Sequence, residues 1–315
     1  DIIIYDDLKN YLTKKYRDIT ESEIQRAISI LDNIPASPLY NGNKDTYLKV
    51  SEGYDLIRED ASQTALHIDY IDFSEDGINN NVFRVVNQYT VEDVTFRRPD
   101  LLVFINGIPV AIFEFKTAIE EDKTIYDAWK QIHIRYYRDI PKLLKYNFLS
   151  VISDGANTKM GSIFSDYQFY YSWNKANEQD KVTNGISSLF TMMEGVFAKD
   201  RLLQILRDFI FYPENAKNED AIVCRYPQFF AANKMLDSLK VHKKPDGDGK
   251  GGIYFGATGC GKTYAMMFLA RLLMLREKDV FHNPTIIIIT DREDLDNQAS
   301  KLFVKAKSYL HDSNV

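Results

Sequence analysis

The sequence predicts an α/β protein of two domains, each organised around one short motif. The first observation is a stretch, Arg97–Lys116, in which two apolar runs flank the dipeptide Asn-Gly at 106–107, a pattern typical of a β-hairpin. The second is a glycine-rich run, Gly256–Thr263, set between a short apolar run and an Ala/Leu/Met-rich one, which favours strand, phosphate-binding loop and helix. The third is length, because 315 residues suit about two domains.

Composition narrows the class of protein. With 45% hydrophobic and 27% charged residues the chain resembles an ordinary globular protein. A net charge of −6 argues against a uniformly basic nucleic-acid binder but leaves room for a local basic groove. Cys224 and Cys260 lack zinc-site spacing, so a reducing, cytoplasmic setting is expected. No run of about 18 apolar residues and no signal peptide is evident, so we expect no membrane contact.

The residues before the hairpin predict helices and then strands. Residues 6–32 predict two helices, the second beginning at a capping box formed by Thr20 and Glu23. The prolines and asparagines of residues 35–43 predict a loop. β-branched and aromatic runs at 65–73 and 81–91 predict strands that lead into the hairpin.

The hairpin carries charges at positions where charge is costly. Its strands are predicted at 101–105 and 108–115, with Asp100 at the start and Glu114 and Lys116 at the end. Burying a charge is unfavourable unless it is paired or bound to a metal. Glu114 and Lys116 point to the same face because they are two apart on a strand. Two carboxylates can hold a hard cation such as Mg²⁺, and an ammonium beside them can position the attacking water.

The register of the hairpin decides whether these groups can meet. A tight two-residue turn would set Asp100 opposite Phe113 and leave Glu114 on the other face. A three-residue loop with Gly107 left-handed would place both carboxylates on one face. We therefore predict an odd-length loop or a bulge near Pro109. A sheet edge whose inward charges discourage aggregation is the alternative interpretation.

After the hairpin, helices and one more strand are expected before the second motif. Thr117 can cap a helix from about residue 118 to 139, ended by Pro141. Residues 146–153 predict a buried strand. Helices are predicted at 185–198 and 200–212 after a polar stretch at 174–180. These elements divide the chain into a first domain at 1–175, a helical connection at 176–215 and a second domain at 216–315.

The second motif satisfies GxxxxGK[ST] in full. Its glycines let backbone N–H groups surround a phosphate at a helix N-terminus. Lys262 would reach the β- and γ-phosphates of ATP and the Thr263 hydroxyl would bind Mg²⁺. Short strands at 252–255 and 285–290 would frame the helix at 263–275. The predicted nucleotide-binding residues of the loop are Gly256, Thr258, Gly259, Cys260, Gly261, Lys262 and Thr263.

The hairpin residues resemble a known nuclease motif. Pro99-Asp100 and Glu114-Phe115-Lys116 are similar to the PD-(D/E)xK motif, and the longer string from Arg98 to Lys116 resembles the motor (restriction) subunit of type I restriction-modification enzymes. The run Asn81–Gln88 resembles the strand that precedes this hairpin in that family. The resemblance implies a RecB-like PD-(D/E)xK nuclease domain followed by a RecA-like P-loop lobe, with Asp100 and Glu114 as metal ligands and Lys116 as a catalytic residue.

The resemblance also points to a helix beside the metal site. Such nucleases carry Gln and Tyr four residues apart there, whereas Gln131 and Tyr136 are five apart in this sequence. Residues at i and i+5 of an α-helix face different directions. Either a π-bulge realigns the two side chains and Gln131 joins the catalytic residues, or Gln131 has no such part.

Two further segments resemble superfamily 2 helicases. Arg225-Tyr-Pro-Gln228-Phe is similar to the adenine-binding Q motif, which makes Gln228 a candidate nucleotide ligand. Residues 290–298, TDREDLDNQ, are similar to motif Ia, which approaches DNA in that family, although an acidic helix N-terminus would explain them as well. Later helicase motifs are absent after Gln298, so we expect the N-terminal part of a larger subunit with an incomplete first lobe.

Taken with the resemblance, the two motifs imply a type I site-specific deoxyribonuclease that requires Mg²⁺ and ATP. Its expected partners are duplex DNA, which it would translocate and cut, and the modification (methyltransferase) and specificity subunits of the same system. The alternatives are a RecB-like repair or phage-defence nuclease-helicase and, in a different class, a non-catalytic, nucleotide-gated DNA-binding module.

Overall fold

The computed structural model describes residues 1–117, 124–215 and 219–311, and the chain forms two compact units. Unit 1 comprises residues 1–176 and 181–207, and unit 2 comprises residues 177–180 and 208–315. The segment expected to connect the domains, 176–215, contains the helices α8 (Ser188–Val196) and α9 (Lys199–Asp208). Within the part of the chain that is described, no helix is both long and apolar enough to span a bilayer.

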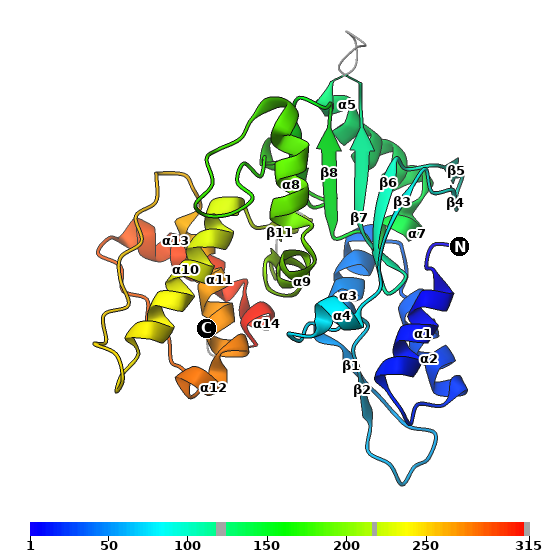
Figure 1. Cartoon of the computed structure of the whole chain (residues 1–315), viewed down its shortest axis with the longest axis horizontal. Helices are drawn as coiled ribbons and strands as arrows, with labels where there is room; N and C mark the ends of the chain where they lie inside the picture. Colours follow the sequence, from blue (N-terminus) through cyan, green and yellow to red (C-terminus); the bar gives the residue numbers. More distant parts are fainter. Residues whose placement is uncertain (118–123, 216–218, 312–315) are drawn as a thin grey trace. The chain divides into compact units, whose positions relative to one another are not determined.

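Unit 1 is built on a mixed five-stranded sheet in the order β3-β6-β7-β8-β9 (Figure 1). β7 and β8 are parallel, and the other neighbours are antiparallel. Both parallel strands are buried along almost their whole length, as expected for strands covered on both faces. The strands are β3 (Phe83–Asn87), β6 (Leu101–Ile105), β7 (Ile108–Phe115), β8 (Leu149–Ser153) and β9 (Thr158–Gly161).

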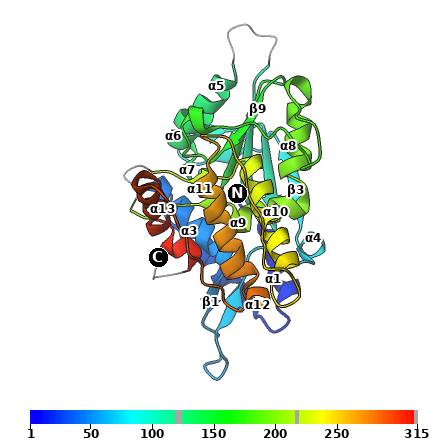
Figure 2. The ribbon, with the colours of Figure 1, turned by 90° about the vertical axis from the view of Figure 1, so that its left-hand side faces the viewer.

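Helices cover both faces of this sheet. Figure 2 shows the helical segment between β7 and β8 along one side and α8 along the other. The segment comprises α5 (Ile125–Lys130), a π-helix η1 (Gln131–Tyr136), α6 (Tyr137–Asp139) and α7 (Pro141–Leu144). Its apolar face packs on the strands in one core that joins Ala128 and Ile132 to Phe104 and Ile112. This packing fixes where η1 lies relative to the end of β7.

Short elements complete unit 1. They are α1 (Tyr5–Lys15), α2 (Glu21–Asp32), α3 (Leu39–Glu52), α4 (Gly77–Asn80), the pairs β1 (Tyr54–Leu56) with β2 (Leu66–Ile68) and β4 (Val91–Glu92) with β5 (Phe96–Arg97), and the 3₁₀ turns η2 (Tyr167–Phe169) and η3 (Gly185–Ser187). The predicted helices before the hairpin and the capping box at Thr20 are confirmed.

The loop expected at residues 35–43 is wrong in its second half. α3 begins at Leu39, and Asn43 is fully buried within it. The Asn43 amide donates to the carbonyl oxygens of Leu144 at 2.9 Å and Asn147 at 3.1 Å. A residue type that usually favours turns is therefore retained in a helix because its side chain satisfies carbonyls from a distant segment.

The hairpin combines a two-residue turn with a bulge. The expected odd-length loop is therefore wrong, and the expected bulge near Pro109 is confirmed. Ile105 pairs with Ile108 across Asn106 and Gly107, whose φ angles are 49° and 81°, as in a type I′ turn. The register then shifts between Val103 and Phe104, which leaves a bulge beside Pro109. A bulge suits proline, which has no N–H to donate to a neighbouring strand.

The helix after the hairpin begins later than expected. It starts at Ile125, where Thr124 and Asp127 form a capping box and the Thr124 N–H donates to Asp127 Oδ2 at 2.9 Å. The expected cap, Thr117, lies outside the helix, and residues 118–123 of the expected helix lie outside the described residues. The predicted end at Pro141 agrees with the break between α6 and α7.

Unit 2 is mainly helical. Its elements are β10 (Ile210–Phe211), β11 (Ile222–Val223), α10 (Tyr226–His242), α11 (Lys262–Arg271), the π-helix η4 (Leu272–Arg276), α12 (Lys278–Phe281), α13 (Glu293–Val304) and α14 (Lys307–Leu310). The strands expected at 252–255 and 285–290 do not form. Ile253, Ile287 and Ile289 are 99%, 79% and 89% exposed. A strand forms only where at least one neighbouring strand pairs with it, and the described residues of unit 2 supply no such neighbour to these two runs.

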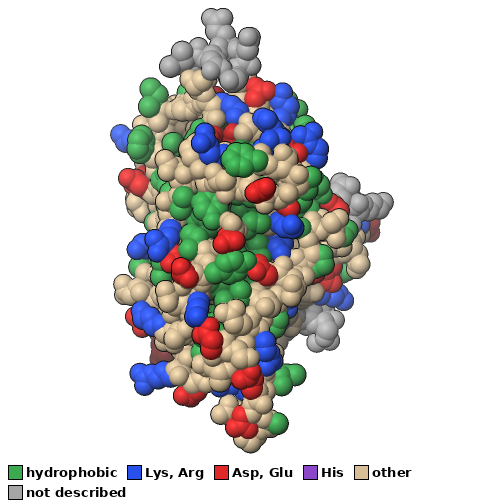
Figure 3. All heavy atoms as spheres, turned by 90° about the vertical axis from the view of Figure 1, so that its right-hand side faces the viewer, with side chains coloured by type: hydrophobic (Ala, Val, Ile, Leu, Met, Phe, Trp, Pro, Cys, Tyr) green, Lys and Arg blue, Asp and Glu red, His purple; other side chains and the backbone are tan. Residues whose placement is uncertain are grey.

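Charge is mixed on one face of the molecule. On the face that Figure 3 shows, acidic and basic side chains are interspersed and apolar side chains lie between them. This agrees with a net charge of −6 and with the expectation that the protein is not uniformly basic.

Candidate functional site: a carboxylate-lysine centre and a phosphate-binding loop

The bulge brings the two hairpin carboxylates onto one face. Beyond the bulge Leu101 pairs with Phe113, so the next step outward places Asp100 opposite Glu114. The two residues are therefore direct cross-strand neighbours, closer than the diagonal arrangement expected from a three-residue loop. The two carboxylates also interact electrostatically, because the negative charge of Asp100 acts to raise the pKa of Glu114.

A closed ring of hydrogen bonds joins Glu114 to the π-helix. Lys116 Nζ donates to Glu114 Oε1 at 2.8 Å and to Gln131 Oε1 at 2.8 Å. Gln131 Nε2 donates to the Tyr136 hydroxyl at 2.8 Å, and that hydroxyl donates to Glu114 Oε2 at 2.9 Å. Both carboxylate oxygens of Glu114 are thus held by groups from two different elements.

The π-helix explains how Gln131 and Tyr136 meet. In a π-helix the backbone bond runs from i to i+5, so side chains five residues apart come to lie on the same side. η1 spans Gln131–Tyr136, the two residues in question. The π-bulge that the sequence left as one of two possibilities is present, and it places Gln131 against Lys116.

Burial controls the electrostatics of the centre. Glu114 is 1% exposed, and this burial raises its pKa to about 7, against the opposing hydrogen bond from Lys116. Burial also raises the pKa of Tyr136, with a further contribution from the charge of Glu114, so its hydroxyl stays protonated and can donate. A cation near Glu114 would favour the charged carboxylate, because opposite charge offsets the cost of burial.

The donor set fits a hard divalent ion. Asp100 and Glu114 offer carboxylate oxygens from adjacent strands, and Mg²⁺ binds through one or two carboxylates while keeping several waters. Groups of three or more His, Cys, Asp and Glu suited to a metal are not found among the described residues. Asp100 and Lys116 line an open hollow of about 430 Å³, which leaves space for water and a phosphate. The residues present are therefore compatible with Mg²⁺.

Asp100 has contacts that the sequence did not suggest. Its Oδ2 accepts a hydrogen bond from the Phe115 N–H at 2.8 Å, and its Oδ1 accepts one from Gln88 Nε2 at 3.0 Å. Gln88 follows β3, which pairs with β6. The resemblance of the run Asn81–Gln88 to a family strand was the available indication, since an antiparallel partner of β6 must end beside Asp100.

In unit 2 the glycine-rich loop leads directly into α11. Gly259 and Gly261 both have φ of 79°, and Gly261 is the N-cap residue of the helix. Lys262 begins α11, and its Nζ donates to the carbonyl oxygens of Gly256 at 3.0 Å and Ala257 at 3.1 Å. Thr258 lies exposed in the turn. The loop expected to surround a phosphate therefore lies at the N-terminus of α11, and Lys262 folds back onto its first residues.

Gln228 lies against this loop. Its side chain is buried, its Oε1 accepts from the Arg225 N–H at 2.9 Å, and its Nε2 is 3.3 Å from the Gly261 carbonyl oxygen and 3.4 Å from that of Cys260. The structure therefore brings together the two motifs that the sequence placed about 30 residues apart. In this conformation both ends of the amide are bonded to the chain.

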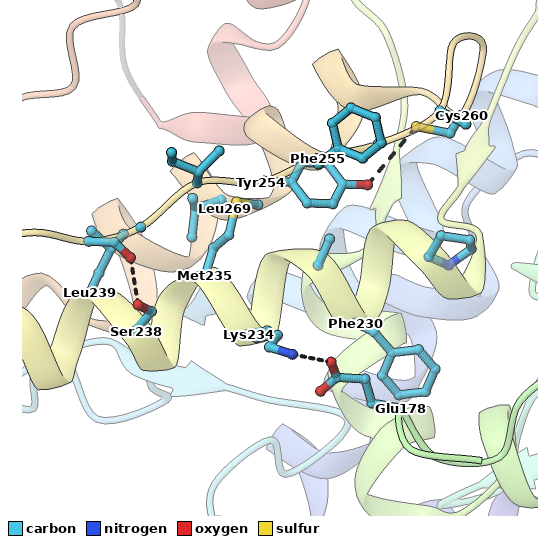
Figure 4. Close-up of a pocket in the computed structure, with 17 residues that line it drawn as sticks. Glu178, Phe230, Lys234, Met235, Ser238, Leu239, Tyr254, Phe255, Cys260 and Leu269 are labelled. Atoms are coloured by element: carbon cyan, nitrogen blue, oxygen red, sulfur yellow. Dashed lines mark hydrogen bonds and ion pairs between the residues drawn. The ribbon is translucent and has the colours of Figure 1, made fainter. Parts of the chain in front are cut away.

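Two hollows flank the loop. One, of about 950 Å³, lies between α10 and residues 251–257 and is mostly apolar; Figure 4 shows Met235, Leu239 and Tyr254 around it. The Tyr254 hydroxyl approaches Cys260 Sγ at 4.0 Å there (Figure 4). The other, of about 500 Å³, is lined by Gly261 and Thr263 together with polar residues of α13, Gln298 among them. Thr263 thus faces space that a phosphate or ion could occupy.

Comparison with known proteins shows the family of the chain. Residues 3–169 match the family model described as type I restriction enzyme R protein N terminus. The chain belongs to this family. Residues 227–314 match a second model, described as SWI2/SNF2 ATPase, and this match includes the glycine-rich loop.

Curated relatives of this chain carry consistent names. It is 33% identical over 94% of its length to a protein of Methanocaldococcus jannaschii named as the MjaIXP type I restriction enzyme endonuclease subunit. It is 26% identical over 98% of its length to the type I restriction enzyme HindI endonuclease subunit of Haemophilus influenzae. A Staphylococcus aureus endonuclease subunit is 23% identical over 96%. The chain spans about 30% of the length of these relatives.

Proposed function

We propose that this chain carries the nuclease centre and the start of the ATP-binding motor of a type I restriction endonuclease. The observation that carries the proposal is the convergence of Asp100, Glu114 and Lys116 from adjacent strands on one face. Charged groups are placed in a buried sheet when their chemistry is used, because burial alone opposes them. The relatives are named as type I restriction enzyme endonuclease subunits, which supports the same activity.

The centre would hydrolyse phosphodiester bonds of duplex DNA. Asp100 and Glu114 would hold Mg²⁺, which supplies charge stabilisation and an activated water when bound. Lys116 would orient the attacking water or stabilise negative charge on the phosphate, since its Nζ is held between Glu114 and Gln131. Gln131 and Tyr136 would keep the carboxylate and the ammonium in place, with Gln131 contacting the catalytic lysine directly.

The second unit would bind ATP. The loop residues Gly256–Thr263 would surround the phosphates, Lys262 would leave its carbonyl partners to reach them, and the Thr263 hydroxyl would bind Mg²⁺. Gln228 would contact the adenine, which requires it to exchange hydrogen bonds that it makes to Arg225 and Gly261. ATP-driven translocation of DNA, and assembly with modification and specificity subunits, would belong to the whole enzyme.

Asp100→Ala in the complete enzyme tests separate nuclease and ATPase sites. We expect loss of DNA cutting with ATP hydrolysis unchanged, because Asp100 lies in unit 1 and the phosphate-binding loop in unit 2. Agarose-gel cleavage and phosphate-release assays on one preparation measure both. Loss of both activities together would reject the assignment of two sites.

A structural role for the carboxylates is the second candidate, favoured by one observation: the ring through Glu114, Lys116, Gln131 and Tyr136 is already closed by hydrogen bonds. The protein would then be a nucleotide-gated DNA-binding module. Crystals soaked in Mn²⁺ decide between the two, because anomalous density between Asp100 and Glu114 supports the nuclease and its absence supports the module. A RecB-like repair or phage-defence nuclease-helicase would share the metal site but would not copurify with a methyltransferase.

A further inference from the structure

Gln88 makes contacts to Asp100 through both its backbone and its side chain. Its N–H donates to the Asp100 carbonyl oxygen at 2.9 Å, and its Nε2 donates to Asp100 Oδ1 at 3.0 Å. The other carboxylate oxygen accepts from the Phe115 N–H. With the hydrogen bond from Gln88, both carboxylate oxygens of Asp100 are held by donors from the chain. Gln88 also lines the same open hollow as Asp100 and Lys116.

The backbone of Gln88 is in a conformation that glutamine rarely adopts. Its φ is 51°, in the left-handed region that favours glycine, asparagine and aspartate. Six non-glycine residues among those described have positive φ, and the other five are all asparagine or histidine: Asn106, Asn215, His282, Asn283 and His311. Glutamine lacks the short polar side chain that stabilises this conformation locally.

The stability of the folded chain does not explain why glutamine occupies position 88. A non-glycine residue held in the left-handed region costs about 1 to 3 kcal/mol, and one hydrogen bond from its exposed amide returns only about 1 kcal/mol. Glycine would fit the backbone without that cost. Strain of this kind is typical of residues whose side chain is needed at a functional site.

We propose that Gln88 is a positioning residue of the nuclease centre, which holds the Asp100 carboxylate in the orientation that faces Glu114 so that both can bind one divalent ion. The inference rests on the proposed nuclease function. Groups that orient a metal ligand through a hydrogen bond commonly change metal affinity by 10- to 100-fold when removed. Gln88 acts through Asp100 and not on the DNA phosphate itself.

Gln88→Gly separates positioning from stability. We expect its melting temperature to be unchanged or higher, because glycine relieves the strained φ. We expect about tenfold weaker Mn²⁺ binding by calorimetry and about a tenfold rise in the Mg²⁺ concentration for half-maximal cleavage by the complete enzyme. ATP hydrolysis should not change. Gln88→Asn, which keeps the amide and tolerates the backbone but is one methylene shorter, should retain less than half of the metal affinity.

Gln63→Ala, on the exposed loop between β1 and β2, is the control and should leave metal affinity and cleavage unchanged. Unchanged Mn²⁺ affinity in Gln88→Gly would overturn the inference, and a lower melting temperature with unchanged Mn²⁺ affinity would show a purely structural role. Asp100→Asn distinguishes the two proposals. If Asp100→Asn abolishes cleavage and Gln88→Gly does not alter metal binding, only the inference fails. If Asp100→Asn leaves cleavage intact, the proposed nuclease function and the inference about Gln88 both fail.

Discussion

Gln131 Nε2 and the Tyr136 hydroxyl are 2.8 Å apart although the two residues lie five positions apart along the helix. The π-helix η1 makes this contact possible, and its position is set by the core beneath it, to which Ile132 and Tyr136 both belong. π-bulges are often found at functional sites because an inserted residue redirects the side chains around it. Here the redirected pair supports Glu114 and Lys116.

Tyr136→Phe tests the support of Glu114. The change removes one donor from Glu114 Oε2 and leaves Gln131 without its acceptor, while the ring stays in the core. We expect about 1 kcal/mol of lost stability and a 10- to 100-fold fall in cleavage, measured by urea unfolding and by single-turnover cutting. Tyr170→Phe, another buried tyrosine, is the control for general core effects. Equal losses of cleavage in both variants would contradict a specific role for Tyr136.

Lys116→Ala tests the ammonium. The variant leaves Glu114 buried without its cation, so we expect cleavage to become undetectable while ATP hydrolysis by the complete enzyme continues. Lys130→Ala is the matched control, because Lys130 ends the neighbouring α5 and its ammonium pairs with Asp127 at 2.6 Å instead of with Glu114. Cleavage by this control should stay within about twofold of wild type. Cleavage retained by Lys116→Ala would remove Lys116 from the proposed chemistry.

The strands of the hairpin could be predicted from the sequence, but their register could not. The strand ends at 101–105 and 108–115 follow from apolar runs around a turn dipeptide. The bulge depends on contacts from elsewhere: Asn147 Nδ2 donates to the Pro109 carbonyl oxygen at 2.6 Å and the Phe148 N–H donates to that of Val110 at 2.9 Å. Local sequence does not contain those partners, so it allowed two arrangements and could not choose between them.

Dependence on distant contacts also explains why Gln88 was missed and why two strands expected in unit 2 do not form. Chemical type and spacing identified Asp100, Glu114 and Lys116, because charges within apolar strands are conspicuous. Gln88 was not identified, because its role depends on a backbone angle and on the pairing of β3 with β6. In unit 2 continuous apolar runs predicted strands at 252–255 and 285–290, but a strand exists only with a neighbour, and neighbours are a tertiary property.

Glu23→Gln tests, as a function of pH, how much the charged Glu23 carboxylate at the start of α2 contributes to stability. Burial acts to raise the pKa of Glu23, but hydrogen bonds from the Thr20 and Glu59 N–H groups and from Arg58 outweigh it and lower the pKa to about 2. A carboxylate with a depressed pKa contributes stability above its unfolded pKa, near 4.5, and loses that contribution as the pH falls toward 2.

We therefore expect Glu23→Gln to cost about 2 kcal/mol at pH 7 and progressively less at pH 4 and pH 3. Fluorescence in urea measures this for unit 1 alone, because both tryptophans of the chain, Trp129 and Trp173, lie in it. Glu21→Gln, at an exposed position of the same turn, is the control and should change little at any pH. A cost for Glu23→Gln that does not depend on pH would show that its charge is not what stabilises α2.

Gly261→Ala and Gly259→Ala form a matched pair in the loop proposed to bind phosphate. Both glycines have φ of 79°, so alanine strains both backbones by about 1 kcal/mol. They differ in space: a Cβ on Gly261 would lie 2.2 Å from Gln228 Nε2, whereas a Cβ on Gly259 would meet nothing within 4 Å. Gly261→Ala must therefore displace Gln228 as well, and we expect it to bind a fluorescent ATP analogue at least tenfold more weakly than Gly259→Ala. In a Gln228→Ala background, Gly261→Ala should weaken binding no more than Gly259→Ala does if the clash with Gln228 is the cause. Equal affinities for the two single variants would show that contact between Gln228 and the loop does not influence nucleotide binding.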